Sequence, residues 1–254
     1  MQLSDIDYDL PEELIAQVPV EPRDSARLLV SRTAGERIDR RVADIGDYLG
    51  PGDLLVVNDT RVVPARLSLQ RATGGAVEVL LLEQDPASPG RWEALVRGAR
   101  RLSDGEVLSV EGHEVLRIGP RTAAGDTFEV EFIVDSPDEL VHRIGSVPLP
   151  PYIRTRLPDP ERYQTVYARR EASAAAPTAG LHFTPALLET LESSGVRIAR
   201  VELVVGLDTF KPISTDDPLD HAIHTESYRV PAGASELSGW MAWSRGGRPL
   251  RGPS

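Results

Sequence analysis

The sequence predicts an α/β fold that is interrupted by an inserted all-β unit, and three observations lead to this prediction. Residues 1–63 and 146–231 combine helix-start signals with β-branched runs that are typical of buried strands. Residues 64–134 carry strand patterns without helical periodicity, separated by Gly or Pro turns. Regularly spaced short strands are typical of a small barrel or sandwich, and a compact β unit between α/β segments indicates an insertion.

The domain boundaries follow from these changes of pattern. With 254 residues, 41% of them hydrophobic, the chain is long enough for one large or two modest domains with a packed core. We expect a discontinuous α/β domain of residues 1–63 plus 146–231, an inserted β domain of residues 64–145, and an irregular tail of residues 232–254.

The first segment predicts a short helix, a strand pair and one strong strand. Pro11 opens the helix and Pro19 closes it, "SARLLVSR" and "RIDRRV" pair across the turn "TAGE", and "ADIGDYLG" forms a further helical turn. The strong strand spans residues 53–57. It delivers four polar residues at its end, where sites of α/β proteins assemble: Asn58, Asp59, Thr60 and Arg61.

The inserted segment predicts six strands and then a helix. The strands are "ARLSLQR", "AVEVLLLE", "RWEALVRG", "EVLSVEG", "EVLRIG" and "TFEVEFIV". Ser136 and Glu139 form a capping-box pattern for the helix, which ends at Gly145. The extended "SVPLPPYI" that follows is either a linker or, through Tyr152 and Ile153, the wall of a binding groove.

The stretch "AAPTAGLHFTP", residues 175–185, places a histidine loop directly before a helix. Thr184 is a favoured N-cap, Gly195 is a good helix stop, and "VRIARVELVV" then predicts a buried strand. The unpaired N–H groups of such a helix start suit a carboxylate or phosphate beside His182. A plain loop with a structural histidine is the alternative interpretation.

The C-terminal part adds a second group of candidate residues. The polar loop "GLDTFKP" supplies Asp208 and Thr209 at a strand end. "DHAIHTESYRV" brings His221, His224 and Glu226 close together in the sequence. This spacing lacks a flanking helix signature and a second ligand cluster, so it favours hydrogen-bonding or acid/base roles over zinc.

Composition limits the possible classes of function. The chain has no cysteine, which excludes disulfides and thiolate chemistry, and it shows no signal peptide or membrane span. The net charge of -11 argues against a general nucleic-acid binder without excluding a local basic patch. Of the 28 basic residues all but Lys211 are arginine, and they cluster at Arg97, Arg100 and Arg101, at Arg154 and Arg156, and at Arg169 and Arg170.

Taken together, the motifs resemble the S-adenosylmethionine:tRNA ribosyltransferase-isomerases of queuosine biosynthesis. The resemblance extends from about residue 3 to about residue 230 and is carried by "DYDLPEELIAQ", "RDSARLLV", "YLGPGDLLVVNDTRVVPARL", "TGGAVEVLLL", "GSVPLPPYI", "RYQTVYA", "APTAGLHFT" and "HAIHTESY". It implies an α/β domain interrupted by a β-barrel domain. It also implies transfer of the ribosyl part of S-adenosylmethionine to 7-aminomethyl-7-deazaguanine in tRNA, with loss of adenine and methionine and formation of epoxyqueuosine.

This chemistry needs a base for an acidic ribose carbon and a proton for the departing adenine. We therefore expect catalytic roles for His182, His221, His224 and Asp59. We expect substrate contacts from Asn58, Thr60, Arg61, Thr178, Gly180, Phe183, Thr184, Asp208, Thr209 and Glu226. The expected partners are tRNA and S-adenosylmethionine, with no cofactor and no metal. We expect a cytoplasmic monomer that does not bind membranes.

Two departures from the family pattern leave other hypotheses open. Val204 stands where the family has a histidine, and Asp208 stands where it has a glycine. The chain also ends earlier than the family, so we expect a poorly ordered tail and a strand near Val201–Val205 that becomes an edge. The alternatives are an inactive remnant that only binds RNA or a ligand, and an S-adenosylmethionine-using enzyme with a different nucleobase.

Overall fold

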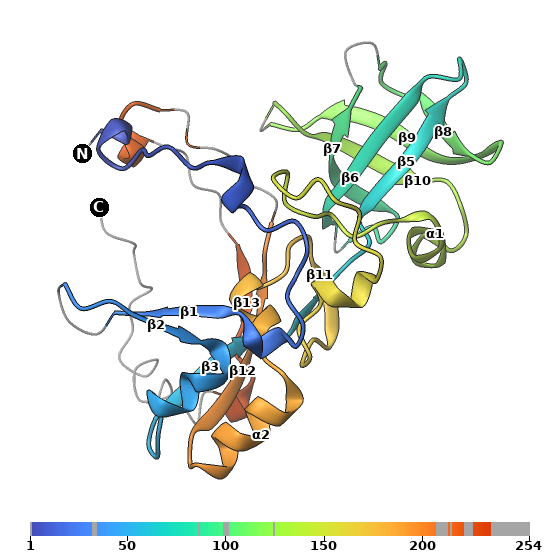
Figure 1. The fold of residues 1–254 in the computed structure, drawn as a ribbon. Helices are drawn as coiled ribbons and strands as arrows, with labels where there is room; N and C mark the ends of the chain where they lie inside the picture. Colours follow the sequence, from blue (N-terminus) through green and yellow to red (C-terminus); the bar gives the residue numbers. More distant parts are fainter. Residues whose placement is uncertain are drawn as a thin grey trace.

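The inserted segment folds into a closed six-stranded antiparallel barrel, which decides between barrel and sandwich. The computed structural model describes residues 2–31, 35–85, 87–98, 102–123, 125–206, 213, 215–220 and 226–234. All six predicted strands are present: β5 (Arg66–Arg71), β6 (Ala76–Gln84), β7 (Arg91–Arg97), β8 (Val107–Val110), β9 (His113–Arg121) and β10 (Phe128–Phe132). Their order is β10-β7-β6-β5-β8-β9, and β10 pairs with both β7 and β9, so the sheet has no free edge (Figure 1).

Alternation along the strands fills the barrel with aliphatic side chains. In β5, Leu67 and Leu69 are fully buried, whereas Ser68 and Gln70 are exposed. The interior is completed by helix α1 (Pro137–Ile144), whose Leu140 belongs to the same apolar cluster. The alternation of hydrophobic and polar residues along each segment therefore predicts both that it forms a strand and which side chains fill the barrel.

Helix α1 begins and ends where the sequence predicts, but not through the predicted capping box. The Ser136 side chain makes no capping hydrogen bond, and the first turn is held instead by the Leu140 N–H donating to the Ser136 carbonyl at 3.2 Å. Pro137 already removes one N–H group that a cap would satisfy. Gly145 ends the helix, and a Cβ there would lie 1.9 Å from the Pro64 carbonyl oxygen. The chain therefore leaves the barrel against its own entry point.

The remaining strands form three small sheets, two of which contain parallel pairs. β1 (Arg27–Val30) and β2 (Ile38–Arg41) form the expected hairpin, and β4 (Thr60–Val62) lies parallel to β11 (Arg170–Ser173). β12 (Arg197–Val204) lies parallel to β3 (Leu54–Asn58) and antiparallel to β13 (Ser227–Arg229). Parallel pairing of strands before and after the barrel makes this a mixed α/β fold with an interrupting barrel.

The expectation that a strand near Val201–Val205 becomes an edge is wrong. β12 is the central strand of its sheet, because Glu202, Leu203 and Val204 pair with β13 on the side away from β3. The segment "SYR", with the β-forming Tyr228 at its centre, makes this pairing and was not predicted as a strand. The predicted disordered tail lies, from residue 235 onward, outside the described residues.

Several short segments of the described chain form 3-10 turns, only some of which were predicted as helices. These turns are η1 (Leu3–Asp5), η2 (Glu12–Leu14), η3 (Arg23–Ser25), η4 (Val42–Asp47), η6 (Pro160–Tyr163), η7 (Thr178–His182) and η9 (Pro218–Asp220). The helix predicted between Pro11 and Pro19 shrinks to η2, since flanking prolines leave too few residues to propagate a helix. α2 (Pro185–Ser193) is an α-helix like α1, with Thr184 as its N-cap and Gly195 at φ 91° beyond its end.

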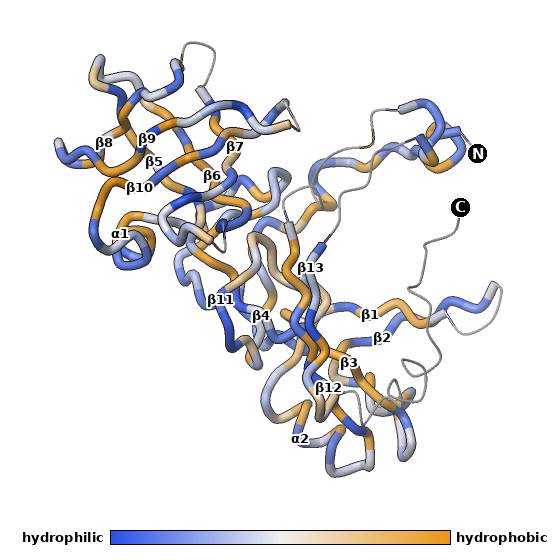
Figure 2. The backbone as a smooth tube through the Cα atoms, turned by 180° about the vertical axis from the view of Figure 1, so that it is seen from behind, coloured by the Kyte–Doolittle hydropathy of each residue, from blue (hydrophilic) through white to orange (hydrophobic). Residues whose placement is uncertain are grey.

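A second apolar cluster holds the α/β part together. Val57 of β3, Tyr167, Phe183 and Leu191 of α2 pack together in it. Figure 2 shows hydrophobic residues concentrated both in the barrel and around β3 and β12. Within the described part of the chain, no helix is both long and apolar enough to cross a membrane.

Candidate functional site

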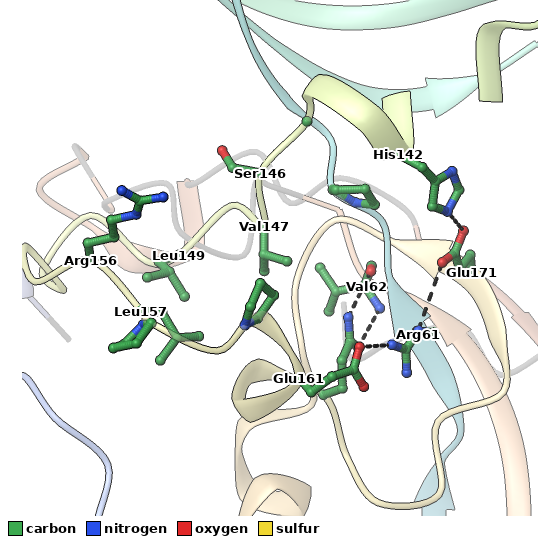
Figure 3. Close-up of a pocket in the computed structure, with 15 residues that line it drawn as sticks. Arg61, Val62, His142, Ser146, Val147, Leu149, Arg156, Leu157, Glu161 and Glu171 are labelled. Carbon is green, nitrogen blue, oxygen red and sulfur yellow. Dashed lines mark hydrogen bonds and ion pairs between the residues drawn. The ribbon is translucent and has the colours of Figure 1, made fainter. Parts of the chain in front are cut away.

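A pocket of about 590 Å³ lies where the chain leaves the barrel and passes β4 and β11. Its walls come from β4, from the stretch that follows α1, and from the loop around η6 (Figure 3). The lining residues are Arg61, Val62, Pro64, His142, Gly145, Ser146, Val147, Leu149, Arg156, Leu157, Pro158, Pro160, Glu161, Gln164 and Glu171. Ser146, Val147 and Leu149 of the Pro-rich segment "SVPLPPYI" line the pocket, whereas Tyr152 and Ile153, the residues predicted to wall a groove, are not among the lining residues.

Arg61 lies on one wall of this pocket between two carboxylates. Its Nη2 forms an ion pair with Glu161, and its Nε lies 3.8 Å from Glu171 Oε1. The side chain is 28% exposed, so solvent screens these pairs only in part. The two carboxylates that pair with Arg61 therefore come from the loop around η6 and from β11.

His142 extends this charged row towards the barrel. Its Nδ1 lies 2.7 Å from the Asp138 carbonyl oxygen, and its Nε2 lies 2.8 Å from Glu171 Oε2. The hydrogen bond to the Asp138 carbonyl and the one to Glu171 raise the pKa of His142. Sequence reasoning missed His142, Glu161 and Glu171 as site residues, because no motif joins them to Arg61 along the chain.

Asn58 and Thr60 use their polar atoms inside the protein. The Asn58 amide accepts from the Leu203 N–H at 3.1 Å and donates to the Leu203 carbonyl at 2.9 Å. Thr60 Oγ1 lies 3.0 Å from Asn58 Oδ1 and 2.8 Å from Ser173 Oγ. These bonds join the ends of β3, β4, β11 and β12, so both side chains align the strands that carry Arg61.

Asp59 is a buried carboxylate in the same strand-end motif. Its backbone N–H donates to the Val201 carbonyl at 2.9 Å, which fixes the residue beside β12. Burial raises the pKa of Asp59, and the charge of Arg169 opposes this shift. Burial also raises the pKa of Tyr167 to about 12, with a smaller contribution in the same direction from Asp59. A buried acid of this kind is typical of functional sites.

The histidine loop forms the 3-10 turn η7 and packs tightly against Tyr167. A Cβ at Gly180 would lie 2.1 Å from Tyr167 Oη, so a larger residue does not fit there. Phe183 is buried in the second apolar cluster, whereas Thr178 and His182 are exposed. Glycine at 180 therefore permits close packing of the loop.

Thr184 serves the fold in two ways. Its Oγ1 accepts from the Leu187 N–H at 3.2 Å, as expected of the N-cap of α2. The same hydroxyl donates to Asp24 Oδ2 at 3.0 Å. A carboxylate from the protein itself thus already lies at the predicted anion-binding position.

A hydrogen-bonded chain connects the strand-end motif with the histidine loop. The Gln164 amide bonds both the N–H and the carbonyl of Val62, each at 2.9 Å. Arg23 Nη1 then donates to the carbonyls of Gln164 and Leu181, at 2.7 and 3.1 Å. The described lining of the pocket includes Arg61, but neither Asp59 nor any residue from 178 to 184.

Several predicted residues fall beyond what the structure describes. His221, His224, Asp208 and Thr209 lie outside the described residues. Glu226 is described, and its Oε1 accepts from the Gly206 N–H at 3.3 Å. Among the described residues there is no group of three His, Cys, Asp or Glu side chains that could hold a metal ion.

Val204, the position where the family has histidine, lines a smaller pocket. This pocket of about 250 Å³ lies over β12 and β13. Arg170 lines it as well, and the Arg170 guanidinium lies 2.8 Å from Glu202. The hydrocarbon side chain of Val204 supplies no proton carrier there.

Comparison with known proteins gives a consistent result along the chain. Residues 3–239 match the family model described as queuosine biosynthesis protein. The chain is 49% identical to S-adenosylmethionine:tRNA ribosyltransferase-isomerase of Symbiobacterium thermophilum, over 98% of this chain and 73% of that protein. It is 48% identical to the protein of the same name from Dehalococcoides mccartyi, over 89% of this chain and 66% of the relative.

A solved structure is also similar in sequence. The crystal structure of S-adenosylmethionine tRNA ribosyltransferase from Thermotoga maritima shares 33% identity, with 95% of this chain and 66% of that chain covered and a TM-score of 0.37. The family model and the curated relatives cover both the barrel and the small sheets around it. On these matches, the chain belongs to the queuosine biosynthesis protein family.

Proposed function

We propose that this chain is an S-adenosylmethionine:tRNA ribosyltransferase-isomerase. It moves the ribosyl part of S-adenosylmethionine to 7-aminomethyl-7-deazaguanine in tRNA, which gives epoxyqueuosine. The observation that carries this proposal is the 49% identity, over 98% of the chain, to a curated relative with that name. The inactive remnant and the enzyme with another nucleobase substrate are the outcomes that the experiment below distinguishes.

The charges around the pocket support S-adenosylmethionine as its ligand. Figure 3 shows Arg156 and Glu161 on opposite sides of apolar side chains that include Leu149 and Leu157. S-adenosylmethionine carries a cationic ammonium and sulfonium, an anionic carboxylate and a largely apolar base. In our proposal the carboxylate binds Arg156, the cationic groups face Glu161, and the apolar wall packs against the rest of the ligand.

The acid/base groups of the reaction are proposed from the family resemblance. A base must take the proton from the ribose carbon beside the sulfonium, and an acid must assist adenine as it leaves. We propose His182, His221, His224 and Asp59 for these roles. Asp59 and His182 are not among the lining residues of the pocket, so this proposal requires the reacting ribose to extend beyond that lining. The raised pKa of Asp59 supports its choice, because an acid with a pKa nearer neutrality transfers protons more readily in both directions.

The remaining proposals concern organisation. We propose that residues 1–63 and 146–231 form the catalytic domain and that residues 64–145 form a separate barrel domain. The separate apolar clusters of the two regions support this division. We also propose a cytoplasmic monomer that takes tRNA and S-adenosylmethionine as substrates and uses no resident cofactor.

Ribose-labelled S-adenosylmethionine tests the function directly. Incubation with tRNA that carries 7-aminomethyl-7-deazaguanine is expected to transfer the label to tRNA and to release adenine and methionine. The same tRNA with guanine at that position should remain unlabelled, and Arg61→Ala should transfer little label while His113→Gln, on the barrel surface, behaves as wild type. Binding of the labelled substrate without transfer would support the remnant hypothesis and overturn the proposal.

A further inference from the structure

Both ring nitrogens of His142 face oxygen atoms that accept hydrogen bonds. Nδ1 lies 2.7 Å from the backbone carbonyl oxygen of Asp138, and Nε2 lies 2.8 Å from Glu171 Oε2. A carbonyl and an ionised carboxylate have no proton to donate, so each contact needs an N–H on the ring. A neutral imidazole has only one. The geometry therefore fits the imidazolium form of His142.

Glu171 passes this interaction on to Arg61. One Glu171 oxygen binds His142, and the other lies 3.8 Å from Arg61 Nε. Arg61 in turn pairs with Glu161. Figure 3 shows these side chains joined by dashed lines along one wall of the pocket, with charges that alternate in sign. If His142 lost its positive charge, Glu171 would be free to turn fully towards Arg61.

The elements around His142 supply few other charges. Its own helix α1 contributes Asp138, and β11 contributes Glu171. β4 contributes Arg61, while β5, which packs against α1, contributes Arg66, whose guanidinium pairs with Glu78 at 3.2 Å. The two hydrogen bonds raise the pKa of His142, with the bond to the Asp138 carbonyl as the larger cause. Glu171 is thus the carboxylate that responds to the protonation of His142.

We propose that His142 is a positioning residue of the Arg61 pocket, which holds Glu171 and through it the direction of the Arg61 guanidinium. For the identity of the ligand, this inference rests on the proposed function. For the link between His142 and Arg61, it rests on geometry alone. His142 lines the same pocket, and the effect that we propose for it passes through Glu171 and Arg61.

Binding measurements test the effect on the ligand. Calorimetric titration of S-adenosylmethionine into wild type starts below the ordinary histidine pKa of about 6.5 and continues to higher pH, because the pKa of His142 is raised. Wild-type affinity is expected to fall about tenfold as the pH rises through the folded-state pKa of His142. His142→Gln should bind about tenfold more weakly at the acidic end and lose the part of the pH dependence that wild type owes to His142. His113→Gln, on an exposed barrel residue, should keep the wild-type profile.

A second measurement needs no ligand and therefore separates this inference from the proposed function. The Arg61 Nε–H signal in a ¹⁵N NMR spectrum is identified by its absence in Arg61→Lys. In wild type it should shift with the same pH midpoint as the His142 ring signals. If wild type fails to bind S-adenosylmethionine, the proposed function is wrong, whereas a shared midpoint still supports the positioning role. An Arg61 signal that ignores His142, or a folded His142→Gln with wild-type binding and pH profile, overturns the inference.

Discussion

Two amide side chains, Asn58 and Gln164, act as short pieces of β-strand. Each presents an oxygen to a backbone N–H and an NH₂ group to a carbonyl of the same residue, Leu203 for Asn58 and Val62 for Gln164. The side-chain amide thereby replaces the backbone of a neighbouring strand at the point where β3 and β4 run out. Both residues lie beside Arg61 in space, so they keep the strand that carries it in register.

Replacement of Gln164 by glutamate tests this role. Gln164→Glu keeps the shape of the side chain but places an oxygen against the Val62 carbonyl, where Gln164 donates a hydrogen bond. We expect a loss of about 1–3 kcal/mol in the free energy of unfolding, the usual cost of an unpaired buried polar group. Urea denaturation measures it. Gln70→Glu, on an exposed barrel position, serves as the control, and equal stability of the two variants would contradict this role.

For Asp59 we predict the opposite effect on stability, because its substitution should stabilise the fold. Burial raises the folded-state pKa of Asp59, so the native state binds a proton more readily than the unfolded chain. The free-energy cost of burying the ionised Asp59 carboxylate is absent below the unfolded-state pKa. It grows as the pH rises from the unfolded-state pKa to the folded-state pKa, and it is constant at higher pH. Asp59→Asn should therefore gain up to about 1 kcal/mol over wild type at neutral pH and nothing in acid.

Urea denaturation at several pH values measures this gain, and the ribosyl-transfer assay measures what it costs in activity. A loss of activity together with a gain in stability would fit the proposed acid/base role. A variant that is less stable than wild type at neutral pH would show that the Asp59 carboxylate stabilises the folded state rather than destabilising it.

At the scale of elements, sequence patterns predicted the strands and helix ends that depend on residues close together in the chain. Six barrel strands were found because each alternates in hydrophobicity and ends at turn residues, and α2 was found through Thr184 and Gly195. The pairing of β12 with β13 was missed, since "SYR" is too short to show a period. Arg61 was singled out from its motif, but Glu161 is 100 residues away and only the fold brings the two together.

The start of α2 offers a test within one helix. Thr184→Ala removes both the cap for the Leu187 N–H and the hydrogen bond to Asp24, and should cost about 1 kcal/mol of stability. Thr190→Ala, on the exposed face of the same helix, removes only a bond to the Ala186 carbonyl and introduces a better helix former. Thermal unfolding should therefore lower Tm for the first variant and leave it equal or higher for the second.

At the scale of the whole molecule, the chain enters and leaves the barrel at one point. Arg66 and Ser146 pair across this point by two backbone hydrogen bonds, of 3.0 and 2.9 Å, and Gly145 packs against the Pro64 carbonyl. β4 begins just before the crossing, and the pocket wall of residues 145–149 comes just after it. The barrel therefore sets the distance between the two halves of the pocket.

A cavity in the barrel core should also destabilise the strands β3 and β12, which lie outside the barrel. Leu108→Ala removes a fully buried side chain and should cost about 2–5 kcal/mol. Because the barrel holds Arg66 against Ser146, hydrogen exchange should also become faster in β3 and β12. Val196→Ala in the second apolar cluster is the reciprocal variant, and it should leave exchange in the barrel strands near the wild-type rate.

The single point at which the chain enters and leaves the barrel also affects the order in which the parts of the molecule fold. Every parallel pair in the α/β part joins a strand before the barrel to one after it, β3 with β12 and β4 with β11. With the insertion unfolded, these pairings would have to close loops of 107 residues, between β4 and β11, and 138 residues, between β3 and β12, each at an entropic cost of about 4 kcal/mol. A folded barrel shortens each effective loop by the length of the insertion and lowers this cost by about 1 kcal/mol, while its own strands are contiguous in sequence and need no help from outside. We therefore predict that the barrel folds before the parallel pairs close, so that the pocket is among the last features to form.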